Sequence, residues 1–357
     1  MTPDTTLILT ATAVSFLTAT LLVPRARRAA CRYGLTDRPG RGKIHQLAIP
    51  YLGGVAIVLA VAGSISVLPA WTATGAAILV GGVIVGLVGL VDDVRNLGPG
   101  VKLTAEAVAA SVAVAGGVGV QLFGGPLDDV LTVGWLVLVT NAFNLLDNMD
   151  GAAAAVAVCT SVMLLAVAIV GEQPLVIGLA GVVGGASLGF LIYNWHPATI
   201  YMGDTGSLFL GFILSAAVLS LRFPAGRVAG GVAAVLMVLP ALFDTTLVVL
   251  SRLAARRPVH VGGTDHTSHR LLRVGVPQPW VVVILGSASM TGGGLGMAVG
   301  RGAVAVGPAL VTVLAVAVLS LAVLLRVSVY EEPDPDAPSR PPAAMSVEPP
   351  ELVANVA

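Results

Sequence analysis

Apolar stretches of about 20 residues, divided by short breaks of polar, glycine or proline residues, repeat along the first 326 positions. A helix of that length crosses the hydrocarbon core of a bilayer. The pattern predicts an all-α polytopic membrane protein with eleven transmembrane helices, and ten is the alternative count. The predicted spans are 5–23, two spans within 44–91 divided near Gly63-Ser64 and Pro69, 103–123, 128–146, 152–171, 174–193, 206–222, 228–251, 278–299 and 303–326.

The chain after residue 326 has a different composition, rich in Pro, Asp and Glu. Such a segment buries too little apolar surface to offset the conformational entropy lost on ordering. We therefore expect an integral membrane domain over 1–326 and a disordered cytoplasmic tail over 327–357.

The distribution of basic residues predicts the orientation. The loops after the first, third, fifth, seventh and ninth spans, with the tail, hold 16 of the 19 Lys and Arg residues. The exceptions are Arg222, Arg227 and Arg301. Because basic loops stay on the cytoplasmic side, the N-terminus is expected outside and the C-terminus inside. The first apolar run precedes its arginines, as a retained span does and a cleaved signal peptide does not.

Composition excludes several classes of protein. Apolar residues make up 56% of the 357 positions and charged residues 11%, with a formal net charge of zero, and the mean hydropathy is +0.93. A soluble domain carries about 25% charged residues. Soluble, disordered and nucleic-acid-binding proteins are therefore excluded, and Cys31 and Cys159 are too few for a disulfide framework or a zinc site.

Ionisable residues gather on the predicted cytoplasmic side. All five histidines and most carboxylates outside the tail lie there, whereas the other side has only Asp4, Asp128, Asp129 and Glu172. Ionisable groups at membrane depth are costly and indicate function. A transporter would place them near the bilayer midplane, and this pattern at one edge disfavours that alternative.

Two segments suit phosphate and metal chemistry. Asp92 and Asp93 are adjacent carboxylates at the end of a predicted span, followed by Lys102. Carboxylates of this kind hold Mg²⁺ or accept a proton, and a lysine offers a point charge to phosphate. The second segment carries Asn144, Asp147 and Asp150 at spacings of three, so their side chains share one face of a helical turn.

Two further segments complete the pattern. In 194–207, Gly203 and Gly206 allow close approach of the backbone to a ligand, and Tyr201 offers a flat face to a base. In 252–270, several arginines precede an Asp-His-x-x-His-Arg sequence that ends at Arg270. Arginine forks bind pyrophosphate oxygens well.

Together these segments resemble the polyprenyl-phosphate N-acetylhexosamine-1-phosphate transferase family, which includes phospho-MurNAc-pentapeptide translocase and GlcNAc-1-phosphate transferases. The resemblance rests on their order, spacing and predicted side. The matching pieces are VDDVRNLGPGVKL, NAFNLLDNMDG, NWHPATIYMGDTGSLFLG, GGTDHTSHRLL and, in the first predicted cytoplasmic loop, KIHQLAIPYLGG with His45.

The resemblance implies an activity. The phosphate of undecaprenyl or decaprenyl phosphate would attack the β-phosphorus of a UDP-N-acetylhexosamine at the cytoplasmic face of a bacterial membrane, giving polyprenyl-diphospho-sugar and UMP. Mg²⁺, with Mn²⁺ as an alternative, is the implied cofactor. The partners are the two substrates and the bilayer, with no nucleic acid, and homodimers occur in the family.

The resemblance also implies roles for individual residues. The implied catalytic residues are Asp92, Asp93, Lys102, Asp147 and His266. The implied metal ligands are Asp204 and Asp147. The implied substrate-binding residues are His45, Asn144, Asp150, Asn194, Tyr201, His269 and Arg270.

Two departures from the family pattern bear on the substrate. Asp147-Asn148-Met149-Asp150-Gly151 stands where Asp-Gly-Leu-Asp-Gly is usual, and Asp-His-Thr-Ser-His-Arg replaces a run of consecutive histidines. The second departure is more typical of the GlcNAc branch. The MurNAc-pentapeptide branch and an inactive scaffold for envelope assembly remain the alternatives.

Overall fold

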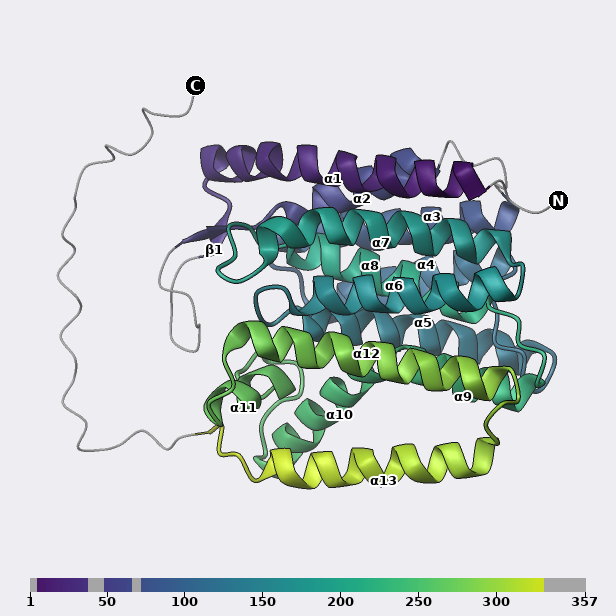
Figure 1. Cartoon of the computed structure of the whole chain (residues 1–357). Coiled ribbons are helices and arrows are strands. Elements are labelled where there is room, and N and C mark those ends of the chain that lie inside the picture. The colour runs from purple at the N-terminus through teal and green to yellow at the C-terminus, as the bar shows by residue number, and fades with distance from the viewer. Residues whose placement is uncertain (1–4, 38–47, 66–71, 331–357) are drawn as a thin grey trace, which may run out of the picture.

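The computed structural model describes residues 5–37, 48–65 and 72–330 as a bundle of helices (Figure 1). The one small sheet there pairs β1 (Thr36–Asp37) with β2 (Ile49–Pro50) in antiparallel fashion. The helices are α1 (Thr5–Tyr33), α2 (Gly53–Ile65), α3 (Ala73–Arg95), α4 (Pro99–Ala115), α5 (Pro126–Leu146), α6 (Ala152–Val170), α7 (Pro174–Asn194), α8 (Gly203–Ser220), α9 (Arg227–Met237), α10 (Leu239–Ala254), α11 (Thr267–Arg273), α12 (Gln278–Gly300) and α13 (Val306–Leu325).

The helices confirm a polytopic membrane protein. Within the described residues, eight helices are long and apolar enough to cross a membrane, and α9 with α10 forms a ninth candidate when the bent pair is counted as one span. The helices α2 and α4, with 13 and 17 residues, also occupy predicted spans but are shorter. The count of eleven spans therefore stays a prediction.

Two predicted spans were wrong in detail. The span predicted over 228–251 is broken between α9 and α10, whose axes meet at a bend of 70°. Pro240 lies in the first turn of α10, where a proline cannot continue the preceding helix because it lacks an N–H and its ring is bulky. The span predicted over 103–123 ends at Ala115, because Gly116 follows as the cap and Gly117 has a φ of +94°.

The first four residues of the predicted tail make contacts with the bundle. Val327 to Tyr330 are described and lie against the segment between α10 and α12. Arginine side chains bind the backbone carbonyls of Val327, Ser328 and Val329, and the Tyr330 hydroxyl binds Asp265. The division into a membrane domain over 1–326 and a disordered tail over 327–357 stays a prediction. The rest of the predicted tail, 331–357, lies outside the described residues.

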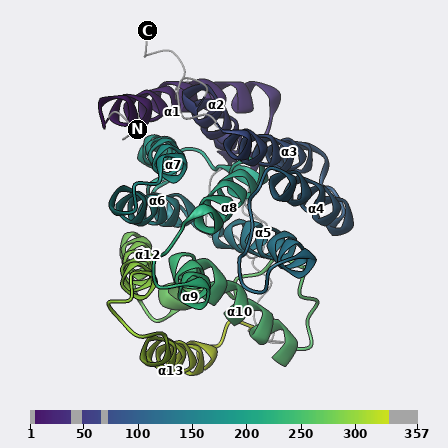
Figure 2. The same cartoon turned by 90° about the vertical axis from the view of Figure 1, so that its right-hand side faces the viewer.

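Helix α8 lies in the middle of the bundle when the structure is seen end-on (Figure 2). Nearly all of its residues are buried. Glycines let two neighbours approach it closely: a Cβ on Gly54 of α2 would lie 2.2 Å from the backbone nitrogen of Gly206, and one on Gly89 of α3 would lie 2.5 Å from the backbone of Asp204. Helices α2 and α3 therefore contact the backbone at the start of α8 directly.

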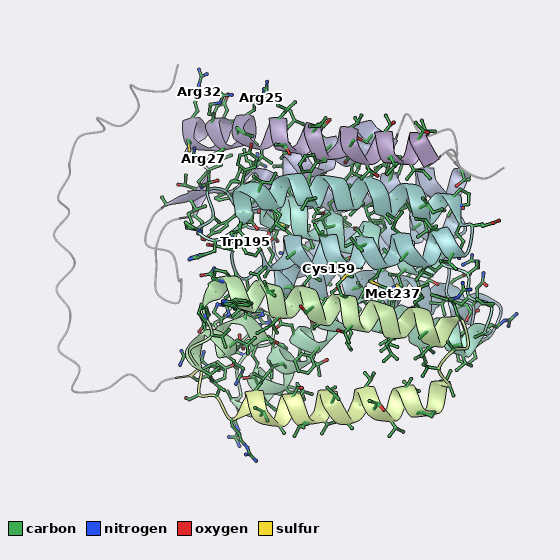
Figure 3. The ribbon with its side chains drawn as sticks, viewed as in Figure 1. Arg25, Arg27, Arg32, Cys159, Trp195 and Met237 are labelled. Carbon is green, nitrogen blue, oxygen red and sulfur yellow. The ribbon has the colours of Figure 1, made fainter. Side chains whose placement is uncertain are left out.

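The connecting segments gather at two opposite ends of the bundle. At one end, Gln173 bonds to the backbone of Arg222 and Ala225 bonds to Gly300. The arginine-rich end of α1 and Trp195 lie at the other end (Figure 3). We call this second end the polar end; it contains the segments 96–98, 147–151, 195–202 and 255–266 and the strand pair. These are the segments that the sequence predicts to share one side of the membrane.

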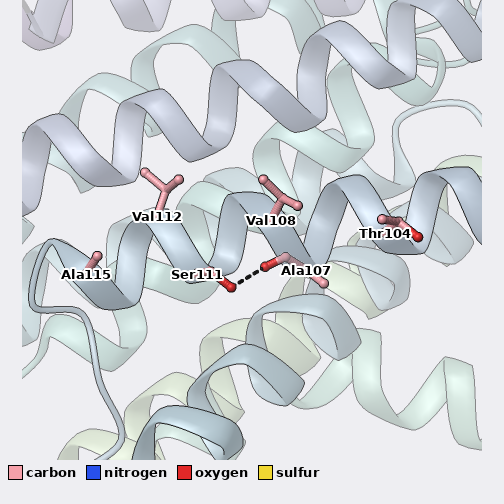
Figure 4. A pocket seen from close by; sticks show the side chains of 6 residues that line it. All are labelled: Thr104, Ala107, Val108, Ser111, Val112 and Ala115. Atoms are coloured by element: carbon pink, nitrogen blue, oxygen red, sulfur yellow. Dashed lines mark hydrogen bonds between the residues drawn. The ribbon is translucent and has the colours of Figure 1, made fainter.

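An apolar groove with a volume of about 460 Å³ runs along the outer face of α4 (Figure 4). Its lining consists of small or β-branched side chains: Thr104, Ala107, Val108, Ser111, Val112 and Ala115. The Thr104 and Ser111 hydroxyls each donate to a carbonyl one turn earlier in the helix. This face therefore leaves neither hydroxyl unpaired, as a surface in contact with lipid requires.

Candidate active site

The site is built on the N-terminal end of α8, which Asp93 of α3 holds. The Asp93 carboxylate accepts hydrogen bonds from the backbone nitrogens of Asp204 and Thr205, at 2.8 and 3.1 Å, and from the Thr205 hydroxyl at 2.6 Å. A carboxylate at a helix N-terminus satisfies unpaired N–H groups and the positive end of the helix dipole. Gly203, with a φ of +68°, leaves room for it, because a Cβ there would lie 2.6 Å from a carboxylate oxygen.

Asp204 lies at the centre of the polar contacts. Its Oδ2 atom is 2.7 Å from the Lys102 ammonium, which also binds Asp92 at 3.0 Å. The lysine thus bridges a carboxylate from α3 and one from α8. One cation between two anions leaves this site with excess negative charge.

Asn144 of α5 approaches Asp204 from the other side. Its amide nitrogen donates to Asp204 Oδ1 and to the Ser207 hydroxyl, both at 2.9 Å. The Ser207 hydroxyl in turn donates to the Gly203 carbonyl at 3.1 Å. Three helices besides α8, namely α3, α4 and α5, therefore supply side chains around Asp204.

Asp147 follows the last residue of α5 and has no side-chain hydrogen bond to another described residue. Burial, followed by the charges of Asp204, Asp93 and Asp150, raises the pKa of this carboxyl group to about 8. Its oxygens are therefore available to a cation or a substrate, and a nearby positive charge would favour its ionised form.

Asp150 connects two polar-end segments. Its Oδ2 atom is 2.8 Å from the His196 ring nitrogen and accepts from the Ala198 backbone nitrogen at 3.0 Å. The Tyr201 hydroxyl bonds to the same carboxyl group, and burial followed by the Asp150 charge raises the tyrosine pKa above its ordinary value. Tyr201 therefore keeps its proton, and its backbone pairs with Tyr51 in a parallel bridge.

Asn194 has surroundings that differ from the expected substrate contact. The residue is 1% exposed. Its amide oxygen accepts from the Gly151 nitrogen and its amide nitrogen donates to the Ile200 carbonyl, both at 3.0 Å. With both ends of the amide bound to backbone, this geometry favours a positioning role between segments 147–151 and 195–202.

The last segment brings its two histidines together. His266 Nδ1 is 2.8 Å from the buried Asp244 carboxylate, which also accepts from the Thr267 backbone nitrogen at 2.6 Å. The ring centroids of His266 and His269 are 5.5 Å apart. The Ser268 hydroxyl donates to the Asn148 side chain, which attaches this segment to 147–151.

Arg270 is also buried, with 1% of its surface exposed. It donates to the backbone carbonyls of Leu324, Val327 and Asp265 and to the Ser251 hydroxyl. We expected a substrate contact, but this guanidinium group is surrounded by protein acceptors and attaches the end of α13 to the polar end.

Sequence reasoning missed two acidic residues of the site as functional candidates. Glu106, 2% exposed, accepts a hydrogen bond from Asn141 and thereby joins α4 to α5. Asp244 binds His266. A carboxylate inside an apolar span is the signal that marks both, because such a group requires a partner in the protein interior. Expected site residue His45 lies outside the described residues.

The donor set around Asp204 fits a hard divalent cation. Among the described residues, no three His, Cys, Asp or Glu side chains surround a common metal position. Mg²⁺ does not need such a group, because it binds one or two carboxylates and completes its shell with water and phosphate oxygens. Asp204 and Asp147 supply carboxylates that act on each other electrostatically.

Comparison with known proteins places the chain among membrane transferases. The model of the Glycosyl transferase family 4 matches residues 76–222. A probable undecaprenyl-phosphate N-acetylglucosaminyl 1-phosphate transferase of Bacillus subtilis is 33% identical, over 78% of this chain and 81% of its own length.

The names of two other relatives give a different lipid or a different sugar. The decaprenyl-phosphate N-acetylglucosaminephosphotransferase of Mycobacterium tuberculosis is 32% identical, over 72% of this chain and 74% of its own length. The phospho-N-acetylmuramoyl-pentapeptide-transferase of Heliobacterium modesticaldum is 30% identical, over 56% of this chain and 70% of its own length.

The buried His269 predicts a pH dependence of stability. Burial, followed by the charge of His266, lowers the pKa of His269 to about 4, below the value of about 6.5 in an unfolded chain. The contribution of this group to the free energy of unfolding is therefore fully present above pH 6.5 and is lost as the pH falls towards 4, with a loss of about 2 kcal/mol at pH 5. We expect the melting midpoint of the purified protein to fall between pH 7.5 and pH 5.

The substitution His269→Gln, which cannot take up a proton, should reduce that fall. His260→Gln is the matched control, because His260 is exposed. An equal fall in the wild type and in His269→Gln would show that His269 does not cause it.

Proposed function

Because the chain belongs to glycosyl transferase family 4, the polyprenyl-phosphate N-acetylhexosamine-1-phosphate transferases, we propose that it transfers GlcNAc-1-phosphate from UDP-GlcNAc to polyprenyl phosphate. The observation that carries this proposal is the arrangement of Lys102, Asn144 and Asp93 around Asp204. The names of two relatives that cover most of the chain support GlcNAc as the sugar.

The reaction joins two anionic substrates. An oxygen of the lipid phosphate attacks the β-phosphorus of UDP-GlcNAc, the bond from that phosphorus to the bridging oxygen breaks, and UMP leaves with the electron pair. The products are polyprenyl-diphospho-GlcNAc and UMP. Such a transfer requires positive groups to offset phosphate charge and to hold the attacking and leaving oxygens in line.

The proposed arrangement in the membrane follows from the two ends of the bundle. We place the polar end on the cytoplasmic side of a bacterial membrane, with the N-terminus outside, the C-terminus inside and eleven spans. This orientation agrees with the positive-inside rule. The lipid phosphate would arrive from the membrane and the nucleotide from the cytoplasm, so a site at the ends of the spans is within reach of both.

We assign the first set of roles to the residues around Asp204. Asp204 and Asp147 would hold Mg²⁺, which when bound neutralises phosphate charge and polarises the phosphoryl group. Lys102 contacts Asp92 and Asp204 and would offer its ammonium to the incoming phosphate. Asp92, the other partner of Lys102, would accept a proton from the lipid phosphate or orient it.

The nucleotide and sugar would lie towards the other segments. Asn144, Asp150 and Tyr201 would bind the nucleoside, since Asp150 and Tyr201 already lie together in segments 147–151 and 195–202. The Nδ1 atom of His266 faces Asp244, which leaves Nε2 as the ring nitrogen that can meet the diphosphate. Asn194 and Arg270 would act by holding these segments in place.

Donor selection tests the proposal. Purified protein is incubated with undecaprenyl phosphate and with UDP-GlcNAc, UDP-GalNAc or UDP-MurNAc-pentapeptide, with and without Mg²⁺, and UMP release is measured. We expect release with UDP-GlcNAc that requires Mg²⁺ and is lost in Asp204→Asn. Turnover with UDP-MurNAc-pentapeptide alone would assign the chain to the other branch, and no turnover with any donor would support an inactive scaffold.

The two adjacent aspartates should behave differently. Asp93 is bound by three donors at the start of α8, so Asp93→Asn should lower the free energy of unfolding by about 1–3 kcal/mol as well as the activity. Asp92 contacts Lys102 and accepts from the Leu97 backbone nitrogen, and an asparagine keeps an oxygen for the second bond. Asp92→Asn should therefore lower kcat by about 100-fold or more, with a smaller fall in melting midpoint than Asp93→Asn.

The control for this pair is Asp129→Asn, since Asp129 is exposed at the opposite end of the bundle. The measurements are UMP release at saturating substrates and thermal melting in one detergent. Turnover within about twofold of wild type for both site variants would contradict the role given to Asp92.

A further inference from the structure

Helix α13 is attached to the rest of the protein chiefly beyond its C-terminal end. It lies at the edge of the bundle (Figures 1 and 2), and Ala309 is its one buried residue. At its end the contacts are polar: Arg270 donates to the carbonyls of Leu324 and Val327, both at 2.7 Å. Arg273 donates to the carbonyls of the next two residues at 2.8 and 3.3 Å.

Tyr330 makes the last of these contacts and reaches the active-site segment itself. Its hydroxyl donates to Asp265 Oδ2 at 2.7 Å and accepts from the Ser251 hydroxyl at 3.3 Å. The Arg257 guanidinium lies over the tyrosine ring, 4.3 Å from the centroid. We call residues Val327–Tyr330, with these contacts, the C-terminal latch.

Asp265 is held firmly by two partners. It is 1% exposed, and Arg252 donates to both of its carboxylate oxygens, at 2.8 and 2.9 Å. Burial alone would raise the pKa of Asp265, but the hydrogen bonds from Arg252 and Tyr330 outweigh it and lower the pKa to about 2. The carboxylate that Tyr330 binds is therefore ionised at neutral pH.

Asp265 directly precedes the histidines of the site. The next residue is His266, whose ring binds Asp244, and α11 then carries His269. A cavity of about 190 Å³ lies beside the latch, lined by Arg252, Arg257, Pro258, Val261, Gly262, Gly263, Asp265 and Tyr330. Because the cavity leaves Asp265 without close apolar packing next to Tyr330, the hydrogen bonds from Arg252 and Tyr330 hold its carboxylate in place.

We propose that Tyr330 is a positioning residue of the active site, whose hydroxyl fixes Asp265 and thereby the place of His266 and His269. This inference rests on the proposed function, in which these histidines meet the diphosphate of the donor. It assigns α13 a task beyond crossing the membrane, because the end of this helix completes the donor side of the site.

The test compares Tyr330→Phe with the wild type. Phenylalanine keeps the ring and its contact with Arg257 but loses the hydrogen bond to Asp265. We expect the KM for UDP-GlcNAc to rise about threefold to tenfold, in line with the loss of one hydrogen bond to a charged group. The KM for the lipid phosphate should stay unchanged, and the melting midpoint should fall only slightly, because the Asp265 carboxylate keeps both bonds from Arg252.

The matched control is Leu319→Ala, a change on the exposed face of α13, which should leave both KM values unchanged. A second readout does not depend on turnover. Hydrogen exchange of the backbone amides in 258–270 should be faster in Tyr330→Phe than in the wild type and in Leu319→Ala.

The outcomes separate the two proposals. A wild type without turnover on UDP-GlcNAc would overturn the proposed function, and hydrogen exchange would then still report on the latch. An active wild type with unchanged donor KM and unchanged exchange in Tyr330→Phe would overturn the latch alone. A lower melting midpoint with both KM values unchanged would also overturn it, because that result describes a purely structural contact.

Discussion

The bonds between the Asp93 carboxylate and two backbone nitrogens at the start of α8 fix the position of Asp204, the residue at the centre of the polar contacts of the site. Those nitrogens belong to Asp204 and Thr205, so the contact places Asp204 directly. Gly89, one turn before Asp93 in α3, allows this approach because it has no side chain to contact the same backbone. Bonds between a carboxylate and N–H groups are charge-assisted and contribute about 1.5–3 kcal/mol each.

Excess negative charge is the second constraint. Lys102 is shared by Asp92 and Asp204, and Asp147 lies near them with a raised pKa. A site of this kind is stable as a partly neutralised cluster and attracts a divalent cation and cationic side chains. The same excess charge would repel two phosphates, which is why the proposed chemistry requires a cation as well as the lysine.

Much of this arrangement could be predicted from the sequence. The length of the apolar runs gave the membrane class, and the order of the charged segments led to a shared polar end that includes Asp92, Asp147, Asp204 and His266. The break at Pro240 was missed because the apolar run continues on both sides of this proline. Hydrophobicity alone does not distinguish a proline that starts a new helix from one inside a single span.

Other features depend on contacts between distant segments, which no local pattern shows. The Asn194 amide oxygen binds a backbone nitrogen 43 residues away, and Arg270 binds backbone carbonyls 54 and 57 residues away. Their residue type and their neighbours in the sequence predicted that both Asn194 and Arg270 contact a ligand. The composition of 327–357 predicts a disordered tail that includes Tyr330. It does not show that arginine side chains contact the first four residues of this segment.

The most direct test of the account is cation binding in the absence of substrates, measured by electron paramagnetic resonance of Mn²⁺ on purified protein. If Asp204 is the metal ligand and Lys102 competes for its carboxylate, Asp204→Asn should lose the tightest site. Lys102→Met should then bind Mn²⁺ more tightly than the wild type while losing turnover. Mn²⁺ binding that is the same in the wild type and in both variants would contradict the assignment of Asp204 as the metal ligand.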